Sequence, residues 1–512
     1  YMGKFLDFYK ISSPSPCKVS QDKVQGRYRN LRMQTFLAAT FGYALYYVCR
    51  TSLNVMKQPI IDSGFLTAGQ LGLIGACLYW TYAVGKFVNG FLADHCNIKK
   101  FMATGLVVSA AANFIMGILG VSCSAAGASG MAMLICFAIM WGINGWSQSM
   151  GAPPAIISLS RWFPLDVRGT WYGFFSASHN FGEGLSFIFV SLMVSLAGWQ
   201  WGFFSAAFAG VLGVVLIILC LHDTPQSKGL PSIEVLAGEE VSALSSEKSG
   251  VFPESSEVPL ESSDVLSDHS GDSSALSGIS SQHYVQDTEP AAGSGRNDDA
   301  ARIQKAVLRN PGVWILALSS AFMYMSRYAI NEWGMFFLQK VKGFGLKEAA
   351  FIIAVNTVMG IIGTVVSGYM SDRIFKGDRK LPALFAGILE TLALVLFLYG
   401  GDGWLVNVLS MTLFGISIGV LISFLGGLMA VDLVPREATG AAIGIVGLAS
   451  YMAAGLMNVV SGWLIDGQAL TDAATGEVLS YDFKYVSLFW TGSAVISFLL
   501  PLLNWHRRPA DF

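Results

Sequence analysis

The most prominent pattern in the chain is a series of long apolar runs separated by short polar stretches. About 20 apolar residues are enough to cross a bilayer as a helix. The pattern therefore predicts twelve membrane helices, six in residues 33–222 and six in residues 302–504. The fold class expected is an all-α polytopic membrane protein with helices near 33–56, 69–93, 100–120, 129–158, 170–196, 200–221, 311–338, 348–370, 381–400, 404–431, 440–465 and 483–504.

The segment between the two sets of runs has a different composition. Residues 223–301 are rich in Ser, Asp, Glu, Gly and Pro, so they cannot bury enough apolar surface to fold. We predict a disordered, acidic, Ser-rich cytoplasmic linker there, with a polar N-terminal segment over 1–32 and a short tail over 505–512. Residues 1–30 lack the apolar stretch of a signal peptide. A passive tether and a regulatory segment are both open as roles for the linker.

Composition supports a membrane protein and excludes several functions. Hydrophobic residues make up 53% of the 512 residues and charged ones only 13%, against about 25% charged in soluble domains. A net charge of −2 argues against a nucleic-acid partner. The seven cysteines show no disulfide pattern or metal-ligand spacing. We therefore expect no cofactor, no metal and no enzymatic activity, and a monomer whose partners are the lipid bilayer and a small molecule.

Basic residues flank one set of helix ends, and this bias predicts orientation. Most of these basic residues lie on the face that holds both termini and the linker. We therefore expect that face in the cytoplasm. The opposite face has far fewer, chiefly Lys57, Lys340, Lys342, Lys347 and Lys484.

The two halves repeat a loop motif. Gly90-x-x-x-Asp94 follows the second run and Gly368-x-x-x-Asp372-Arg373 follows the eighth, at an offset of 278 residues. Parallel six-helix repeats related by an axis along the membrane normal are the architecture of major facilitator carriers. The motif also resembles the cytoplasmic-loop signature of that superfamily, which implies that these five residues belong to conformational-switch loops.

Two arginines inside the apolar runs obey the same repeat. Arg50 lies in the first run and Arg327 in the seventh, 277 residues apart. Charges at membrane depth are costly and mark function by default. Opposed guanidinium groups suit a phosphate or a carboxylate, which they bind through two hydrogen bonds each. The alternative for each arginine is a side chain that reaches the helix end, or a structural salt bridge.

Other polar residues lie at membrane depth near these arginines. Lys86 is a third cation, which contacts the anion or pairs with a nearby acid. His179 is a candidate proton or substrate site, or a satisfied core histidine. Glu183 is one turn further on and can reach His179 or a cavity cation. Tyrosines one or two turns from the cations can donate to phosphate or serve only in packing: Tyr43, Tyr47, Tyr82 and Tyr324.

Four segments resemble the organophosphate:phosphate antiporter family, whose members carry glycerol 3-phosphate or hexose 6-phosphates. They are GYALYYVCR, TYAVGKF, SASHNFG and MYMSRYAINEW, and the resemblance extends to GAAIGIVGLASYMAAG. It implies the major facilitator fold and a phosphate site made of Arg50, Arg327, Lys86 and His179. We also place Asn180 and Tyr451, which lie in matching segments, and Glu183 among the secondary substrate contacts.

The chain departs from the family pattern in the eighth, fifth and eleventh helices. Thr357 stands where members often have an acid, and Glu183 stands in place of a glycine. We hypothesise that Glu183 supplies the missing negative charge from a different helix. Ile443 and Val446 stand where hexose-phosphate exchangers can carry Asp and Lys, so these two positions do not indicate specificity.

The resemblance is nearest to the hexose-phosphate branch, through RYRNLRMQ, LYWTYAVGKF and YAINEWG. It implies exchange of a hexose 6-phosphate, such as glucose 6-phosphate, for inorganic phosphate by alternating access. The expected location is a bacterial inner membrane, with an organelle membrane of a eukaryote as the alternative. Glycerol 3-phosphate as substrate, a sugar-phosphate receptor that contacts a membrane kinase, and a proton-coupled symporter using His179 and Glu183 stay open.

Overall fold

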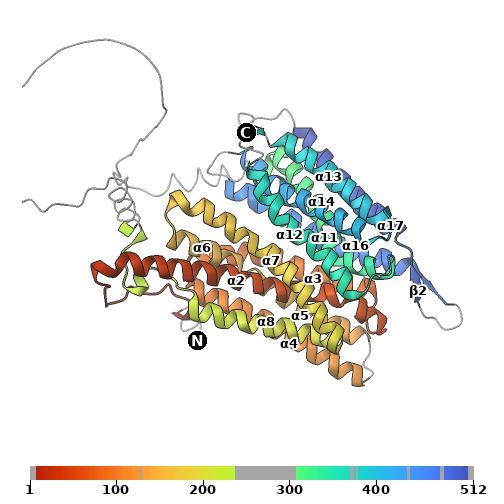
Figure 1. Ribbon diagram of the computed structural model, residues 1–512, viewed down its shortest axis with the longest axis horizontal. Helices are drawn as coiled ribbons and strands as arrows, with labels where there is room; N and C mark the ends of the chain where they lie inside the picture. Colours follow the sequence, from red (N-terminus) through yellow and green to blue (C-terminus); the bar gives the residue numbers. More distant parts are fainter. Residues whose placement is uncertain are drawn as a thin grey trace, which may run out of the picture.

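The apolar runs form helices in the computed structural model. The structure describes residues 7–126, 130–233, 235–236, 307–369, 374–375, 379–434, 439–472 and 478–504. Figure 1 shows two bundles of long helices, the first from α2 to α8 and the second from α11 to α17. Eleven of the described helices are long and apolar enough to cross a membrane. The longer and more polar α2 is the twelfth, so the structure has the all-α fold that the pattern predicts.

The first bundle comprises α2 (Gln21–Asp62), α3 (Ala68–Asp94), α4 (Ile98–Ala126), α5 (Gly130–Gln148), α6 (Ala152–Trp162), α7 (Leu165–Ala197) and α8 (Trp199–Cys220), followed by the short helix η1 (Gln226–Lys228). The second comprises α11 (Pro311–Lys340), α12 (Leu346–Tyr369), α13 (Lys380–Tyr399), α14 (Trp404–Ser423), the π-helix η3 (Phe424–Leu428), α15 (Met429–Val431), α16 (Thr439–Gly467), α17 (Lys484–Leu499) and η5 (Leu500–Asn504). Strands β1 (Ala469–Thr471) and β2 (Val478–Tyr481) form an antiparallel hairpin between α16 and α17.

The fourth helix of each half is interrupted, which the apolar pattern does not reveal. The run expected over 129–158 divides into α5 and α6 at residues 149–151. Pro153 and Pro154 follow at the start of α6, where a missing N–H costs nothing, whereas inside a continuous helix they would each remove a hydrogen bond. The run expected over 404–431 passes through η3 at the matching position of the repeat. Both interruptions therefore belong to the repeated architecture.

The two bundles meet along three pairs of helices: α3 with α16, α7 with α12, and α2 with α11. Small residues allow a close approach at these contacts. A Cβ atom on Gly72 of α3 would lie 2.4 Å from the backbone oxygen of Asn458 on α16. A Cβ atom on Gly462 of α16 would lie 2.5 Å from the backbone oxygen of Ala68. Larger side chains at these two glycines would therefore push the bundles apart.

One end of the molecule, which we call the hairpin face, carries Asp62, Asp466 and the β1–β2 hairpin, and it is closed by bonds between the bundles. The Asp466 carboxylate of α16 accepts from the backbone N–H groups of Ala68 (2.9 Å) and Gly69 (2.7 Å) at the start of α3. Lys340 Nζ lies 2.6 Å from Asp62 Oδ1. A carboxylate on a helix N-terminus is favourable because it meets unpaired N–H groups and the positive end of the helix dipole.

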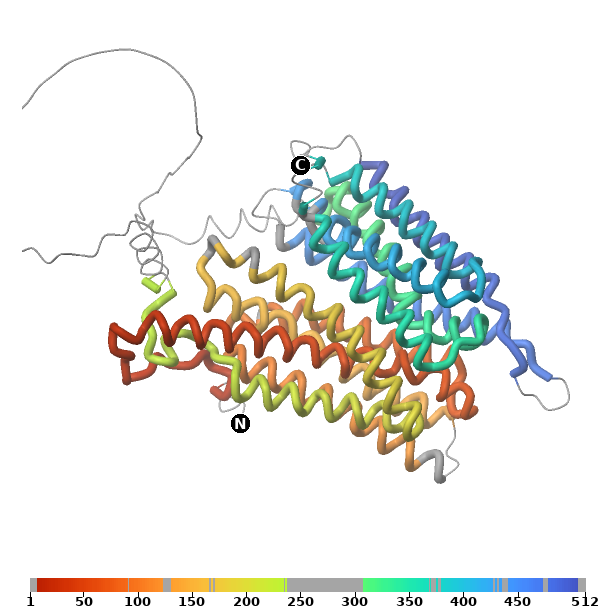
Figure 2. Tube along the Cα trace, in the orientation of Figure 1, coloured from red at the N-terminus to blue at the C-terminus, as the bar shows by residue number. Residues whose placement is uncertain are grey.

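The opposite end, which we call the terminal face, carries Ser12, Asp94 and Arg161. The bundles diverge toward it in Figure 2. Among the described residues, no heavy atom lies within 4 Å of a Cβ added to Gly90 of α3 or to Gly444 of α16. Along α3 and α16 the bundles are therefore in contact near the hairpin face and apart near the terminal face.

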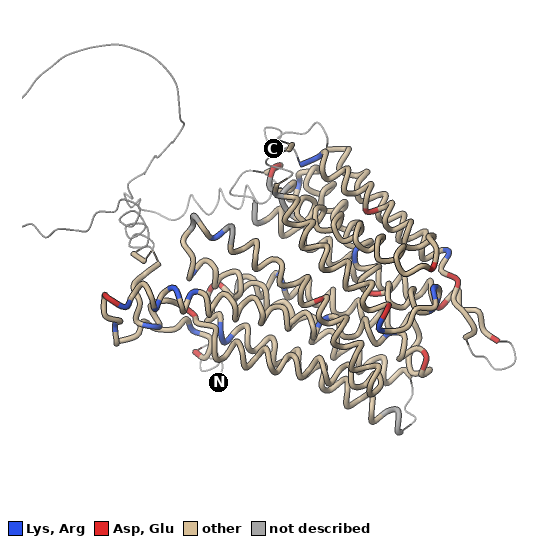
Figure 3. Tube along the Cα trace, in the orientation of Figure 1, with Lys and Arg blue, Asp and Glu red and all other residues tan. Residues whose placement is uncertain are grey.

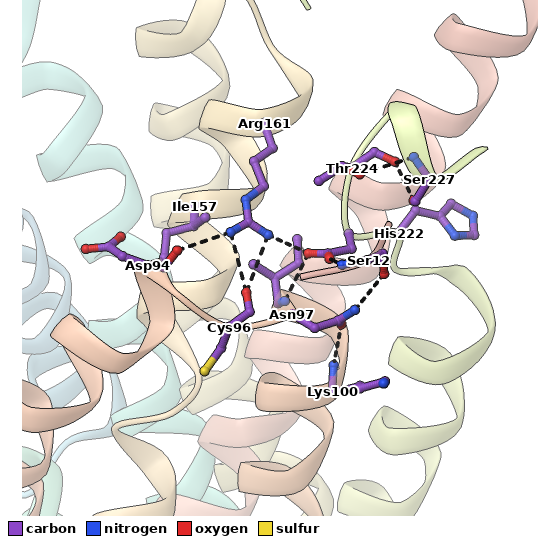
Figure 4. Close-up of polar contacts among 12 residues, drawn as sticks. Ser12, Asp94, Cys96, Asn97, Lys100, Ile157, Arg161, His222, Thr224 and Ser227 are labelled. Atoms are coloured by element: carbon purple, nitrogen blue, oxygen red, sulfur yellow. Dashed lines mark hydrogen bonds and ion pairs between the residues drawn. The ribbon is translucent and has the colours of Figure 1, made fainter. Parts of the chain in front are cut away.

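A polar network at the terminal face ties the N-terminal residues to the first bundle (Figure 4). Arg161 of α6 forms an ion pair with Asp223 and donates to the backbone oxygen of Asp94 at 3.5 Å. The backbone N–H of Ser12 donates to Asp223 Oδ2 at 2.7 Å, and Asn97 Nδ2 donates to Ser12 Oγ at 2.8 Å. These bonds hold the loop after Asp94 in place.

The second copy of the loop motif is not seen in the same detail. Gly368 lies near the end of α12, whereas Asp372 and Arg373 fall outside the described residues. The first residues of the linker expected over 223–301 are placed against the N-terminal segment, since Val19 N–H donates to the backbone oxygen of Gly229 at 3.0 Å. Residues 237–301 and the tail 505–512 fall outside the described residues.

Candidate substrate site

The two arginines come together where the bundles meet. Arg50 lies in the second half of α2 and Arg327 near the middle of α11, with 3% and 6% of their surfaces exposed. Tyr328 of α11 contacts both of them. Its hydroxyl accepts from Arg50 Nη2 at 3.5 Å, and its ring centre lies 5.3 Å from Arg327 Cζ. Each half therefore contributes one guanidinium group to the same place, as the repeat predicts.

Tyrosine rings from both halves surround Arg50. Its Cζ lies 4.4 Å from the ring centre of Tyr82, and the other three rings are between 5.3 and 5.6 Å away: Tyr47, Tyr79 and Tyr451. Ring faces attract cations without neutralising them. Among the described residues, no carboxylate lies within 4.0 Å of Arg50. The site therefore holds a buried cation that has no counter-charge within this distance in the described part of the chain.

Lys86 faces the same region from α3. Its side chain is exposed, yet its Nζ lies 5.2 Å from the ring centre of Tyr451 on α16. A Cβ on Gly447 of α16 would be 3.8 Å from that Nζ. The ammonium group therefore lies between the bundles, not on the lipid-facing side of α3. Among the described residues it too has no carboxylate within 4.0 Å.

The α7 residues and the remaining tyrosines line up beside this group. The ring of half-buried His179 lies 5.7 Å from that of Tyr47. The ring of Tyr324 lies 5.4 Å from that of Tyr451 and 5.9 Å from Arg327 Cζ. The ring of Tyr43 stacks on Phe175 and meets the edge of Tyr47. We therefore expect Tyr43 to support Tyr47 more than to contact a ligand.

Glu183 and Asn180 lie on the side of α7 that meets the second bundle. Glu183 Oε1 accepts from Asn331 Nδ2 at 2.9 Å, and its Oε2 lies 3.7 Å from Arg327 Nη2. A Cβ on the adjacent Gly184 would lie 2.8 Å from Thr357 Oγ1 of α12. Position 183 and position 357 therefore occupy facing helices, which is the geometry that the charge-replacement hypothesis requires. The hypothesis itself stays a prediction.

A buried ion pair near the site was missed in the sequence. Lys57 was expected near the end of a helix on the far face, but α2 continues to Asp62 and Lys57 is fully buried. Its Nζ lies 2.7 Å from Glu332 Oε2 of α11 and 3.3 Å from Asn458 Oδ1 of α16. The expectation for Lys57 was wrong because a cation at the end of an apolar run looks the same whether the helix stops or continues.

The ion pair contacts the arginine site through α3. Tyr79 Oη donates to Glu332 Oε1 at 2.5 Å, while the ring of the same tyrosine lies 5.5 Å from Arg50 Cζ. Asn54 Nδ2 also donates to Glu332 Oε1, at 3.1 Å. One sequence signal was available for part of this cluster, since Arg50-x-x-x-Asn54 repeats as Arg327-x-x-x-Asn331.

The chemistry of the site is that of anion binding. It offers two guanidinium groups, an ammonium group and several hydroxyls, and Figure 3 shows how few charged residues lie away from the helix ends. Within the described residues no group of three or more His, Cys, Asp or Glu could hold a metal ion. Planar guanidinium groups bind phosphate or carboxylate through paired hydrogen bonds.

Known proteins resemble the chain over most of its length. The family model described as Major Facilitator Superfamily matches residues 39–457. A probable hexose phosphate transport protein of Chlamydia muridarum is 30% identical over 84% of each chain. The glycerol-3-phosphate transporter of Bacillus subtilis is 30% identical over 89% of this chain and 91% of its own. The membrane sensor protein UhpC of Escherichia coli is 29% identical over 90% of each chain.

Solved structures agree on the fold. A bacterial homologue of the human lysosomal transporter Spinster, in an inward-facing and occupied conformation, superposes with a TM-score of 0.63 at 14% identity, over 94% of this chain and 98% of that one. The nucleoside transporter NupG gives a TM-score of 0.60 at 16% identity, over 93% of this chain and all of that one. Identities this low support the architecture alone. Together with the sequence relatives, they show that the chain is a multi-pass membrane protein of the major facilitator superfamily, a transporter and not an enzyme, and belongs within it to the organophosphate:phosphate antiporter family.

Proposed function

We propose that the chain exchanges an organic phosphate, a hexose 6-phosphate such as glucose 6-phosphate, for inorganic phosphate by alternating access. The observation that carries this proposal is the pair Arg50 and Arg327, contributed by opposite bundles and joined through Tyr328. Arg50 has no carboxylate within 4.0 Å among the described residues. A buried cation without a partner is costly, and a bound phosphate removes that cost.

The charges of the site match a phosphate. Arg50, Arg327 and Lys86 contribute three positive charges, and Glu183, 3.7 Å from Arg327, contributes one negative charge. A phosphate monoester carries about −1.5 to −2 at neutral pH, which balances the remaining positive charge. His179 lies beside Tyr47 and is placed to donate a further hydrogen bond to the phosphate. We take Arg50, Arg327, Lys86 and His179 as the phosphate ligands. The secondary contacts are Asn180, Tyr47, Tyr82, Tyr324 and Tyr451.

The same charges explain why transport would be an exchange. In the empty carrier the cations repel one another, by about 4 kcal/mol for two unit charges 4 Å apart at an effective dielectric constant of ~20. A phosphate that bridges Arg50 and Arg327 draws the bundles together, which then rock about the site and open on the other side. An unloaded carrier crosses rarely, so organic phosphate enters as inorganic phosphate leaves. The loop at Gly90 and Asp94 lies where such rocking would close the terminal face.

The proposal includes orientation and location. Both termini and the linker lie on the cytoplasmic side of a bacterial inner membrane, so the terminal face is the cytoplasmic one. This structure, held together at the hairpin face by Asp466 and Lys340, is then open toward the cytoplasm. We propose that the carrier works as a monomer, since both arginines come from one chain.

The relatives support both the substrate class and one competing function. Their names mention hexose phosphate and glycerol 3-phosphate. We favour hexose phosphate because of the resemblance of RYRNLRMQ, LYWTYAVGKF and YAINEWG to that branch. The likeness to a membrane sensor protein makes a sugar-phosphate receptor the second candidate. Such a receptor would bind the ligand at the same arginines and signal to a partner such as a membrane kinase.

Transport into liposomes tests the proposal. The purified protein is reconstituted into vesicles loaded with inorganic phosphate, and uptake of labelled phosphate, glucose 6-phosphate and glycerol 3-phosphate is measured. We expect uptake that needs internal phosphate and is lost in Arg50→Lys and Arg327→Lys. Arg168→Lys is the matched control, because Arg168 lies at the terminal face and donates to backbone oxygens there. Saturable binding of glucose 6-phosphate without uptake would instead establish the receptor.

A further inference from the structure

The carboxylate of Glu183 is held by one oxygen and left open at the other. Its Oε1 accepts from Asn331 Nδ2 at 2.9 Å, and Asn331 Oδ1 in turn accepts from Asn356 Nδ2 at 2.8 Å. This chain of amides runs from α12 through α11 to α7 and fixes the orientation of the carboxylate. Oε2 has no hydrogen-bond partner among the described residues, although Glu183 is only 1% exposed.

A comparison with the other carboxylate near the site shows what is unusual. Glu332 uses both oxygens, since Oε1 accepts from Tyr79 and Asn54 and Oε2 pairs with Lys57. Its hydrogen-bonding capacity is therefore taken up by the protein. Glu183 Oε2 lies 3.7 Å from Arg327 Nη2, which is beyond hydrogen-bond range. A buried acceptor left without a donor is costly unless a ligand supplies one.

We propose that Glu183 Oε2 accepts a hydrogen bond from a hydroxyl group on the organic part of the substrate. This inference rests on the proposed function, because it takes the phosphate to lie on Arg50 and Arg327. The Arg327 guanidinium favours the ionised carboxylate and places it next to the phosphate position. Glu183 is thus a specificity-determining residue of the transport site.

The proposal names a substrate class and excludes another. A carboxylate accepts hydroxyl donors well, so phosphates of neutral polyols and sugars fit this subsite. A phosphorylated carboxylic acid brings a second negative charge to the same place, and like charges at short range in a low-dielectric site repel. Glycerol 3-phosphate and glucose 6-phosphate belong to the favoured class, whereas 3-phosphoglycerate belongs to the excluded one. Propyl phosphate, which lacks the hydroxyl groups, should bind through its phosphate alone.

Binding measurements on the full-length protein in detergent test this, because they do not require transport. Calorimetric titrations compare inorganic phosphate, glycerol 3-phosphate, propyl phosphate and 3-phosphoglycerate. For the wild type we expect the affinity for glycerol 3-phosphate to be at least about tenfold higher than that for propyl phosphate. This is the difference that one hydrogen bond to a charged group makes. Glu183→Ala should remove that difference, whereas inorganic phosphate should bind at least as tightly as in the wild type, because the site loses a negative charge 3.7 Å from Arg327. Glu183→Gln, which keeps the shape of the side chain, should raise the affinity for 3-phosphoglycerate relative to glycerol 3-phosphate.

Glu390→Gln is the matched control. Glu390 is also a fully buried glutamate, but it lies on α13, which is not among the helices that join the two bundles. The same substitution there should leave all four affinities in their wild-type order. An unchanged ratio of glycerol 3-phosphate to propyl phosphate in Glu183→Ala would overturn the subsite. Normal selectivity in binding with no exchange in vesicles would overturn the antiport proposal and leave the subsite standing.

Discussion

Two buried clusters lie within two helical turns of each other on α2, and they differ in whether the cation is paired with a carboxylate. Lys57 is paired at 2.7 Å with Glu332 and also donates to Asn458. Arg50 is surrounded by tyrosine rings and has no carboxylate within 4.0 Å among the described residues. A cation whose charge is satisfied by the protein holds helices together, whereas a cation whose charge is unsatisfied is available to a ligand. Stability and transport should therefore depend on different residues.

The largest effect on transport is expected for Arg50→Met. The substitution removes a guanidinium group that we propose binds phosphate, and losing one partner of a buried charged contact costs about 2–5 kcal/mol, or about 30-fold or more in affinity. Folding should not suffer, because a cation without a counter-charge is removed from a buried position. Exchange in liposomes and thermal unfolding in detergent measure the two effects. A clear fall in melting temperature together with unchanged exchange would reverse our assignment of the two clusters.

For Lys57→Met we expect the main loss in thermal stability and not in transport. Glu332 would remain buried without its cation, which costs about 3–5 kcal/mol for a broken buried pair. The thermal stability should fall strongly. The double variant Lys57→Met with Glu332→Gln leaves no unpaired charge and should recover most of the loss, which a thermodynamic cycle from the single variants measures. Equal losses in the double and single variants would show that packing, not charge pairing, matters at Lys57.

The sequence predicted the first cluster better than the second. Arg50 and Arg327 stand out because they interrupt apolar runs at nearly the same offset as the Gly-x-x-x-Asp motif. Lys57 follows the apolar run, and only the continuation of α2 to Asp62 places it inside the protein. Its partner Glu332 lies in a segment recognised for its likeness to relatives, but no spacing connects position 332 with position 57.

The contacts between helices could not be predicted from the sequence either. Tyr328 joins the two arginines, yet in the sequence it is one aromatic residue among many in a membrane helix. The interruption of the fourth helix in each half also depends on backbone geometry that apolar periodicity does not register. Twelve helices and their division into halves follow from composition and repeat, because those depend on local properties. Pairings between α2, α3, α7, α11 and α16 depend on how the bundles dock.

A smaller effect is expected for Glu183→Gly, with Thr357→Glu as its partner change. Removing the carboxylate leaves Arg327 without the charge 3.7 Å away and should slow exchange several-fold, because phosphate is then released less readily from a more positive site. Thr357 faces the backbone of the neighbouring Gly184, so a glutamate there should restore part of the rate. Exchange rates of the single and double variants measure this. Unchanged exchange in Glu183→Gly would end the charge-replacement hypothesis.

The smallest effect is expected for Tyr79→Phe, which tests whether the two clusters act separately. The ring that lies 5.5 Å from Arg50 is retained, while the hydroxyl that donates to Glu332 Oε1 at 2.5 Å is lost. A hydrogen bond to a charged group contributes about 1.5–3 kcal/mol, and Asn54 still donates to the same oxygen, so the stability loss should lie at the lower end. Because the cation–π contact is unchanged, the apparent affinity for phosphate should stay within about twofold of the wild type. Unfolding in detergent and phosphate titration measure the two quantities on one sample. A large change in phosphate affinity would mean that Tyr79 transmits the state of the Lys57–Glu332 pair to Arg50, and the clusters would then have to be treated as one.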